Sequence, residues 1–304
     1  MDERQLSVLR ELAERGSLVA AARALHVTPS AVSQQLAALQ RSCPAPLTER
    51  RGRRLVLTPA GEALASAAVD VAAALDAARR AVGDHLDSAH TPVSVAAFHS
   101  AALAWFGPLL TALDGTPPLR CTDEDVAQDA FPALVADHDV VVAHRPEASP
   151  AWPARRVRVV PLLLEPLHVA LAADHPLAGR EELRVADVAA ERWISVHEGF
   201  PLAGVLDVVA VAARRPLDVV HRINEFFVAA SVVAAGDAVA LMPARTSRPG
   251  PGVVLRPLAD VSVNRRVDAL LRPEALSRRG VRTVLDALRD VAGSPAPPEA
   301  GGTG

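Results

Sequence analysis

Apolar residues recur with helical spacing in two short segments near the start of the chain. The first segment begins at Ser17, whose hydroxyl can accept a backbone N–H and so start a helix. The second begins at Thr28 and Pro29, because proline loses no hydrogen bond at the first helical position. The apolar positions that share one face of each segment are Leu18, Ala21, Ala22 and Leu25, then Val32, Leu36 and Leu39. The pattern predicts two helices joined by a tight turn.

The second predicted helix turns polar residues away from its apolar face. These outward residues, together with the two that start the helix, are Thr28, Pro29, Ser30, Ser33, Gln34 and Gln35. A helix in the major groove meets donor and acceptor patterns that Gln matches on adenine and that Ser matches on several bases. Any amphipathic helix carries polar residues outward, so this face indicates DNA reading only together with its neighbours.

A basic hairpin follows the helix pair. Gly52 can supply the positive φ of a hairpin turn, and residues 55–57 form the returning strand. The flanking arginines are Arg50, Arg51, Arg53 and Arg54. Residues 1–58 hold nine Arg and five acidic residues, a balance of +4, whereas the whole chain carries −3. This local charge suits a phosphate backbone or a narrow minor groove, so we assign Arg51, Arg53 and Arg54 to DNA binding.

These residues carry a family resemblance. The run RQLSVLRELAERGSLVAAARALHVTPSAVSQQLAAL resembles the DNA-binding domain of LysR-type transcriptional regulators, and LTPAGEAL resembles the start of their linker helix. The chain departs from the family pattern at Gln40, at Cys43 and Pro44, and at Thr48, where the family often has Glu, Gly and Phe. The resemblance implies a winged helix-turn-helix over residues 1–58 that reads double-stranded promoter DNA.

A long helix is predicted over residues 59–86, after Thr58 as its cap. Its apolar positions alternate at spacings of four and three residues and are Leu64, Ala68, Val71, Leu75, Ala78 and Val82. Such spacing is typical of a coiled-coil seam, and regulators of the resembled family pair through this helix. We therefore expect a homodimer and, by the resemblance, a homotetramer. Alanine buries little area, so the alternative is a helix that packs on its own chain.

Beyond residue 92, short apolar runs alternate with segments of helical length. The runs VSVAAF, DVVVAH, HVALAA and AVALMP predict a mostly parallel α/β architecture. The segments DHPLA, ADVAAERWIS and VVAAGDAVALMP resemble the effector domain of the same family, whose fold is like that of type II periplasmic binding proteins. The expected fold class is thus α/β, with an N-terminal winged helix-turn-helix and linker helix followed by a two-lobed effector domain.

The resemblance also implies where the lobes divide. We expect an effector-binding domain over 92–291, with lobe I at about 92–162 and 264–291 and lobe II at about 163–263. The chain would cross between the lobes in VVPLLLEPLHVAL and in VLRPLADVSVNRRVDALL. The composition of residues 292–304, rich in Gly and Pro, predicts a disordered tail.

Candidate effector-binding residues follow from the rule that open α/β sheets bind ligands at the carboxyl ends of their strands. The candidates are Phe98, His99, Ser100, Asp125, His144, His197, Glu198, Asn224 and Phe226. Ser100 matches, by the resemblance, a cleft hydroxyl that often touches the effector. Asp125 could instead cap a helix, His99 or His144 could be a core imidazole with its hydrogen bonds satisfied, and Phe226 could be simple packing. His and carboxylates at several strand ends predict a polar effector, with an amine or another hydrogen-bonding head group.

Other patterns exclude several function classes. No run of eighteen apolar residues and no apolar signal segment is present, so we expect a cytoplasmic protein without membrane contact. Cys43 and Cys121 have no metal-ligand spacing. The sequence has none of the motifs of nucleophile elbows, zinc proteases, P-loops or dinucleotide sites. We therefore expect no enzyme, no cofactor and no metal.

The sequence as a whole predicts a LysR-type regulator that reads a promoter and responds to a small molecule bound between two lobes. Its expected partners are promoter DNA, the effector, RNA polymerase and further copies of the chain. Two alternatives stay open, a winged-helix regulator without small-molecule sensing and a solute-binding module. DNA affinity that falls steeply with salt would favour a regulator over a binding module.

Overall fold

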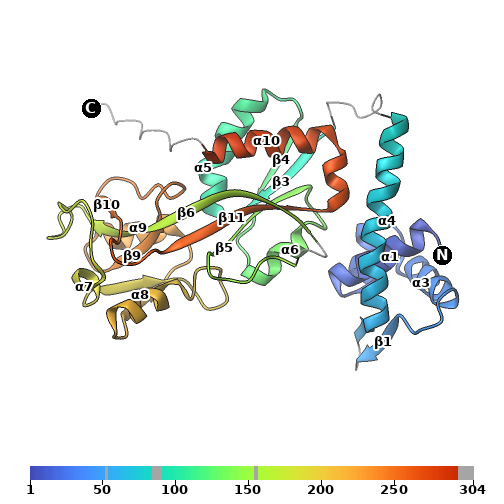
Figure 1. Ribbon diagram of the computed structural model, residues 1–304, viewed down its shortest axis with the longest axis horizontal. Coiled ribbons are helices and arrows are strands. Elements are labelled where there is room, and N and C mark those ends of the chain that lie inside the picture. The colour runs from blue at the N-terminus through green and yellow to red at the C-terminus, as the bar shows by residue number, and fades with distance from the viewer. Residues whose placement is uncertain (52–53, 84–90, 154–156, 294–304) are drawn as a thin grey trace.

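The computed structural model describes residues 1–51, 54–83, 91–153 and 157–293. At the N-terminus a small head is followed by a long helix, and a larger α/β part follows these (Figure 1). The elements of the head are α1 (Glu3–Arg15), α2 (Leu18–Ala24), α3 (Pro29–Arg41), β1 (Thr48–Arg51) and β2 (Arg54–Leu57).

The helix boundaries in the head follow from capping side chains. Asp2 accepts from the backbone N–H of Gln5, and the Gln5 side chain accepts from the Asp2 N–H, which starts α1 with a capping box. Ser17 and Thr28 cap α2 and α3 by accepting from backbone N–H groups three residues ahead, as the sequence predicts. The head core is apolar, with Leu9, Leu12, Val32 and Leu39 all nearly fully buried. The predicted helix pair and hairpin are confirmed.

The linker helix α4 (Pro59–Gly83) begins with a close backbone approach. A Cβ on Gly61 would come within 2.0 Å of the Leu47 carbonyl oxygen, so no larger residue fits without moving the chain. Leu64 packs on the head core and Ala68 is buried within the chain, whereas Val71 is 41% exposed. At least the first part of the predicted seam is therefore in contact with the same chain. The side chains of Ala78 and Val82 lie outside the described part.

The α/β part contains one nine-stranded sheet in the order β4-β3-β5-β11-β6-β9-β7-β8, with β10 also paired to β6. Its strands are β3 (Val93–Ala97), β4 (Leu119–Asp123), β5 (Val140–Pro146), β6 (Arg158–Ala172), β7 (Arg192–Ser195), β8 (Asp218–Arg222), β9 (Val239–Pro243), β10 (Val253–Arg256) and β11 (Asn264–Leu271). Its helices are α5 (His99–Leu113), α6 (Phe131–Leu134), α7 (Val185–Val188), α8 (Val205–Ala213), α9 (Phe226–Ala234) and α10 (Arg279–Gly293), with 3-10 turns η1 (Gln128–Ala130) and η2 (Pro273–Ser277).

The expectation of a mostly parallel sheet is wrong, because the sheet is mixed. β3 runs parallel to β4 and β5, and β7 runs parallel to β8 and β9. β11 is antiparallel to β5 and β6, and β6 is antiparallel to β9 and β10. The cause is the path of the chain, which leaves one half of the sheet through β6 and returns through β11, so these two strands oppose their neighbours.

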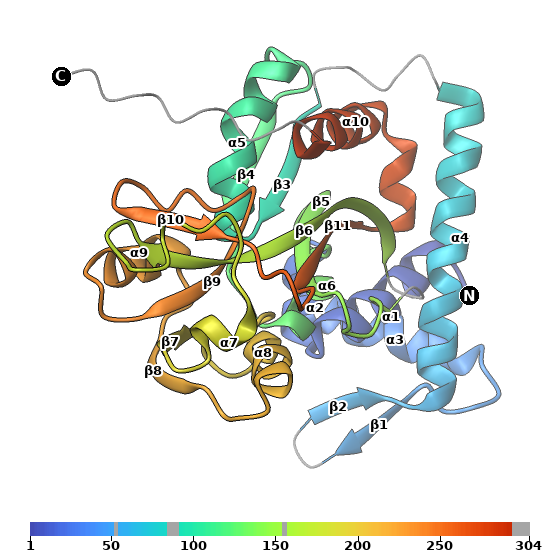
Figure 2. The ribbon, with the colours of Figure 1, turned by 60° about the vertical axis from the view of Figure 1, so that its left-hand side comes forward.

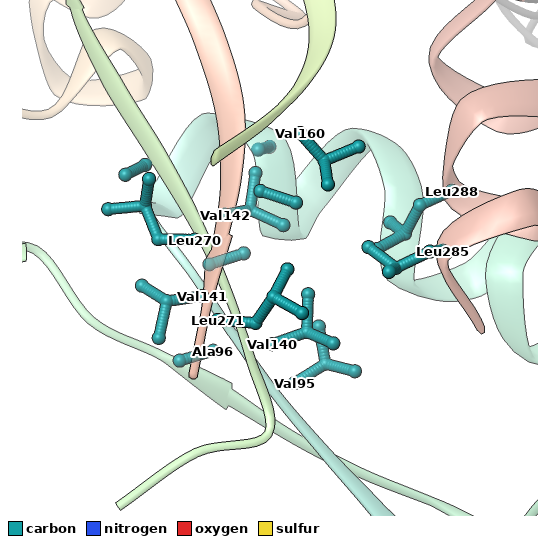
Figure 3. Close-up of a cluster of buried hydrophobic side chains, with 14 of the residues drawn as sticks. Val95, Ala96, Val140, Val141, Val142, Val160, Leu270, Leu271, Leu285 and Leu288 are labelled. Atoms are coloured by element: carbon teal, nitrogen blue, oxygen red, sulfur yellow. The ribbon is translucent and has the colours of Figure 1, made fainter. Parts of the chain in front are cut away.

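Two halves of this part have separate cores. We call the half around β3, β4, β5, α5 and α10 lobe I, and the half around β7, β8, β9, α8 and α9 lobe II. Val95, Val141, Leu270 and Leu285 belong to the lobe I core, where α10 covers the sheet (Figure 3). Trp193 and Leu183 are fully buried in lobe II. β6 and β11 run side by side between the halves (Figures 1 and 2), and residues 158–166 of β6 pair with β11 whereas residues 167–172 pair with lobe II strands.

Ion pairs join the head to lobe I within the same chain. Arg10 of α1 meets Glu274 of η2 at 2.6 Å. Arg272, directly after β11, meets Glu11 at 3.0 Å and Glu14 at 3.1 Å. A cavity of about 450 Å³ lies beside these charges, between α1 and lobe I. Charged side chains thus connect the head to lobe I of its own chain.

Candidate DNA-reading and effector-binding sites

The exposed face of α3 carries most of the predicted DNA-reading residues. Ser30, Ser33 and Gln34 are exposed, and Gln35 is half-buried. Thr28 serves partly as a cap, since its Oγ1 accepts from the Ala31 N–H at 3.2 Å and lies 2.9 Å from the Ser30 Oγ. Pro29 is the first residue of the helix, where its missing N–H costs nothing. The outward face of α3 therefore exposes two hydroxyl groups and an amide to solvent, whereas its apolar face is buried in the head core.

The hairpin stands beside this helix and is anchored through the loop that precedes it. Its strands pair from Thr48 with Leu57 to Arg51 with Arg54. The Gln40 side chain donates to the Ala45 carbonyl at 2.9 Å and accepts from the Leu47 N–H at 2.7 Å. The Gln40 amide thus fixes the loop, and Leu47 is buried ahead of Thr48, which stands where the resembled family often has an aromatic residue.

The predicted basic residues of the hairpin differ in what the structure describes. Arg51 is 74% exposed and meets Glu49 at 2.8 Å, a surface pair that costs little to open. Arg53 and the side chain of Arg54 lie outside the described residues. Arg50 and Arg51 are therefore the basic side chains that the described part of this hairpin presents to solvent, with Glu49 beside Arg51.

A second candidate site lies between the lobes. It is a small cavity of about 30 Å³ that brings together residues from the first turn of α5, from β5 and from β11 with residues of lobe II, including the start of α9. Seven of the nine predicted effector residues line it: Phe98, His99, Ser100, Asp125, His144, Asn224 and Phe226. The remaining lining residues are Val196, Phe200, Pro201, Leu202, Glu225 and Arg265.

Two predicted residues lie outside the lining of this cavity. His197 and Glu198 are exposed after β7, because the chain turns at Gly199, where φ is 84°, and brings Phe200 and the following residues to the cavity instead. His197 contributes through its backbone, since its N–H donates to the Asn224 Oδ1 at 2.9 Å. That bond fixes the position of Asn224 at the cavity wall.

A buried ion pair closes the base of the cavity. The Arg265 Nε donates to the Glu165 Oε2 at 2.9 Å, and both side chains are fully buried. Arg265 Nη2 also donates to the Ser100 Oγ at 3.0 Å and to the Thr246 hydroxyl. Glu165 Oε1 accepts from the N–H groups of Arg245 and Thr246. The pair ties β6 to β11 and to the first turn of α5.

Two buried side-chain nitrogens at this base have no hydrogen-bond partner among the described residues, namely the donor Arg265 Nη1 and His144 Nδ1. The pKa of His144 lies well below its ordinary value, first because burial penalises its charged form and second because Arg265 repels a proton. His144 is therefore neutral, and its ring packs 4.1 Å from the Phe98 ring, centroid to centroid. The Arg265 guanidinium also lies over the Phe98 ring, 4.9 Å from its centroid.

The mouth of the cavity is acidic. His99 lies 3.7 Å from Asp123 and 3.5 Å from Glu225. Burial raises the pKa of Asp125, with His99 acting in the opposite direction. Burial also raises the pKa of Glu225; His99 lowers it, and the charges of Asp125 and Asp123 raise it further. Three carboxylates thus surround a single imidazole.

A second cavity of about 30 Å³ continues into lobe II. It shares Val196, Leu202 and Phe226 with the first, and its other walls are mainly apolar. Within the described residues, no group of three or more His, Cys, Asp or Glu side chains could hold a metal ion. Across the same residues, no helix has both the length and the apolar character needed to cross a membrane.

The sequence argument did not identify Arg265, Glu165 or Thr246, which form the base of the cavity. A signal for Glu165 was present, because it is the only charge within the apolar run VVPLLLEPLHVAL. A lone carboxylate in a buried strand needs a cationic partner. Nothing in the sequence spacing identifies that partner, since Arg265 lies 100 residues away.

A winged helix-turn-helix head joined to a two-lobed α/β domain defines a DNA-binding regulator with a ligand-binding half. Residues 3–62 match the profile of the bacterial regulatory helix-turn-helix protein, lysR family, and residues 87–293 match the LysR substrate binding domain. The chain belongs to the LysR family and is a LysR-type transcriptional regulator, with a helix-turn-helix DNA-binding domain and a substrate-binding domain. The predicted fold class and family are confirmed.

Similar proteins agree with this assignment. The small neutral protease regulatory protein of Streptomyces coelicolor is 33% identical over 271 residues, which cover 84% of this chain and 82% of that protein. A full-length OxyR variant from Pseudomonas aeruginosa has the same fold, with a TM-score of 0.69 at 21% identity over 95% of this chain and 98% of that chain. Full-length CbnR in complex with its target DNA gives a TM-score of 0.51 at 22% identity, covering 96% of this chain and all (100%) of that chain.

Proposed function

We propose that this regulator reads promoter DNA with α3 and the β1–β2 hairpin and that an effector bound between the lobes alters how the heads are held. The observation that carries the proposal is the exposed hydroxyl and amide face of α3 beside a basic hairpin. A related fold is seen bound to its target DNA in the CbnR complex. No catalytic step is assigned, in keeping with a family of transcription regulators. The site of action is the cytoplasm, where promoter DNA is available.

Two substitutions distinguish contacts with the DNA bases from contacts with the DNA phosphate backbone. Gln34→Ala should cost about 1–3 kcal/mol of binding free energy at one base position and relax specificity there. Arg51→Ala should weaken binding to all sequences alike and reduce the slope of log affinity against log salt by about 1. Arg215→Ala, an exposed arginine of lobe II, is the matched control. Unchanged base preference in Gln34→Ala would remove this residue from the reading set.

Effector binding at the inter-lobe cavity is supported by seven predicted residues that share it and by two buried nitrogens that have no hydrogen-bond partner within the described ranges. A ligand that binds only the folded state raises the melting temperature with concentration. Ser100→Ala removes the hydroxyl at the start of α5 and should reduce that rise. An equal rise in wild type and variant, for every ligand that changes the DNA footprint, would place the effector elsewhere.

Pairing of two chains through α4 is proposed for Val71 and Leu75, since Ala68 is already buried against its own chain. Homodimers would place two heads on two half-sites, and homotetramers and RNA polymerase are further proposed partners. Val71→Glu should weaken self-association, measured by sedimentation equilibrium. Glu62→Gln, at an exposed position of the same helix, is the control. If Val71→Glu self-associates as strongly as the wild type, the dimer interface does not include this face of α4.

A further inference from the structure

The base of the inter-lobe cavity offers unused hydrogen-bond donors. Arg265 lines the cavity, is fully buried, and its Nη1 has no partner among the described residues. The Ser100 Oγ, which also lines the cavity, accepts from Arg265 Nη2 at 3.0 Å and lies 3.5 Å from the Thr246 hydroxyl. Phe98, at the start of α5, accepts no hydrogen bond through its side chain from the first backbone N–H groups of that helix. An anionic group would satisfy these donors.

The mouth of the cavity has the opposite preference. Asp123, Asp125 and Glu225 face one another around His99, which lies 3.7 Å from Asp123 and 3.5 Å from Glu225. Burial raises the pKa of both Asp125 and Glu225, and the charges of Asp125 and Asp123 raise the pKa of Glu225 further. A cation placed here would relieve their repulsion, and a ligand with only negative charge would be repelled.

A third feature is the apolar cavity that adjoins the first. Leu206, Ile223 and Leu241 are among its walls, and Phe226 belongs to both cavities. The two cavities share Val196, Leu202 and Phe226 in their walls, so they lie next to each other, and an apolar substituent of a ligand in the first cavity would point toward the second. The site thus has three regions. Carboxylates lie at the mouth of the first cavity, hydrogen-bond donors lie at its base, and mainly apolar side chains line the adjoining second cavity.

We propose that the effector is a small zwitterion of the α-amino-acid type with an apolar side chain. Its carboxylate would bind Arg265 and Ser100, its ammonium would lie between Asp125 and Glu225, and its side chain would extend toward Ile223. This inference rests on the proposed effector function of the same cavity. Each cavity of about 30 Å³ holds little more than a water molecule, so binding requires the lobes to separate about β6 and β11. That requirement couples ligand binding to a change of shape.

The test is a matched ligand series titrated calorimetrically into the full-length protein. The series contains leucine and phenylalanine, their amides, which lack the carboxylate, and 4-methylpentanoate and 3-phenylpropanoate, which lack the ammonium. We expect at least about tenfold weaker binding for each truncated analogue, as expected when one charged contact is lost. Glycine, without an apolar side chain, should also bind more weakly. A carboxylic acid that binds as tightly as its amino acid overturns the proposal, and so does the absence of binding by both amino acids.

Variants of the protein test which residues bind the carboxylate and which bind the ammonium group of the ligand. The double variant Asp125→Asn with Glu225→Gln should lose most discrimination between leucine and 4-methylpentanoate. Ser100→Ala should reduce discrimination between leucine and its amide. Glu198→Gln, an exposed carboxylate outside the cavity lining, is the control and should leave both ratios unchanged. Promoter binding and tryptophan fluorescence confirm that each variant is folded. Unchanged ratios in the double variant and in Ser100→Ala overturn the proposal.

Failure of this inference differs from failure of effector sensing itself. If amino acids do not bind but another ligand raises the melting temperature in a Ser100-dependent manner and shifts the promoter footprint, the ligand class is wrong and the effector site stands. If no ligand does so and Ser100→Ala changes no response, both are wrong. DNA binding by the head is measured independently in every case.

Discussion

Loss of one charge from the buried Arg265–Glu165 pair should destabilise the effector domain strongly. Both side chains are fully buried, and the Glu165 carboxylate accepts four hydrogen bonds, two on each oxygen. Glu165→Gln retains the oxygen that accepts from the backbone N–H groups of Arg245 and Thr246. It replaces the other oxygen by an NH₂ group that faces the Arg265 donor. The substitution therefore leaves a buried cation beside a donor.

The expected size follows from the cost of an uncompensated buried charge. Removing one member of a buried pair costs about 3–5 kcal/mol, whereas replacing both members by neutral residues is often nearly neutral. Arg265→Met combined with Glu165→Gln keeps the acceptor for the two backbone N–H groups and removes both charges. We expect the double variant to lie within about 1 kcal/mol of the wild type, so adding Arg265→Met should restore about 2–4 kcal/mol of the stability lost in Glu165→Gln.

Urea unfolding followed by tryptophan fluorescence measures this quantity in the intact chain. The three tryptophans, Trp105, Trp152 and Trp193, all lie in the effector domain, so the head does not contribute to the signal. The expected order of stability is wild type close to the double variant, with Glu165→Gln far below. If Glu165→Gln lowers the free energy of unfolding by less than about 1 kcal/mol, water reaches the pair or other groups compensate the remaining charge, and the reasoning is refuted.

Three further predictions follow from single residues. The pKa of His144 is depressed in the folded state, so at acidic pH the unfolded chain binds a proton that the native state does not. The free energy of unfolding should therefore fall as pH drops below about 6.5, by at most about 1.4 kcal/mol per pH unit. Above that pH this contribution should stay constant. His144→Phe should lose that contribution in urea titrations at several pH values; an unchanged difference between pH 7 and pH 5.5 would contradict the assignment. Gly61→Ala should displace the hairpin and weaken promoter binding, since its Cβ would meet the Leu47 oxygen at 2.0 Å, whereas Ala63→Gly on the same helix should keep full affinity. Arg272→Ala should release the head from lobe I and increase the radius of gyration in solution scattering; an unchanged scattering profile would show that the remaining ion pairs suffice.

The sequence was most informative where local rules act alone. Ser17 and Thr28 mark helix starts because a cap depends only on residues within one turn, and the spacing of Val32, Leu36 and Leu39 suffices to place the buried face of α3. Ser100 and His144 were also predicted from the order of strands and helices; the structure places Ser100 in the first turn of α5 and His144 inside β5, and brings both to one cavity. Tertiary pairing was not predictable in the same way.

Three outcomes depended on contacts between distant segments. The antiparallel direction of β6 and β11 depends on where the chain crosses between lobes, which strand periodicity does not encode. Arg265 and Glu165 meet across 100 positions of sequence, so neither could be assigned a partner. Ala68 has the spacing of a dimer seam but is buried against its own chain, because coiled-coil spacing does not distinguish one partner helix from another.

β11 links the two charged regions of the molecule through a single strand. Arg265, near its start, binds Glu165 and Ser100 at the base of the inter-lobe cavity, and Arg272, directly after its end, binds Glu11 and Glu14 of the head. A strand paired on both sides moves as a unit, since sliding it would break its ladders with β5 and β6. Displacement of this strand by opening of the cavity would therefore act on the ion pairs that hold the head. Thus Arg272→Ala should uncouple the footprint from ligand while leaving ligand affinity at the cavity unchanged.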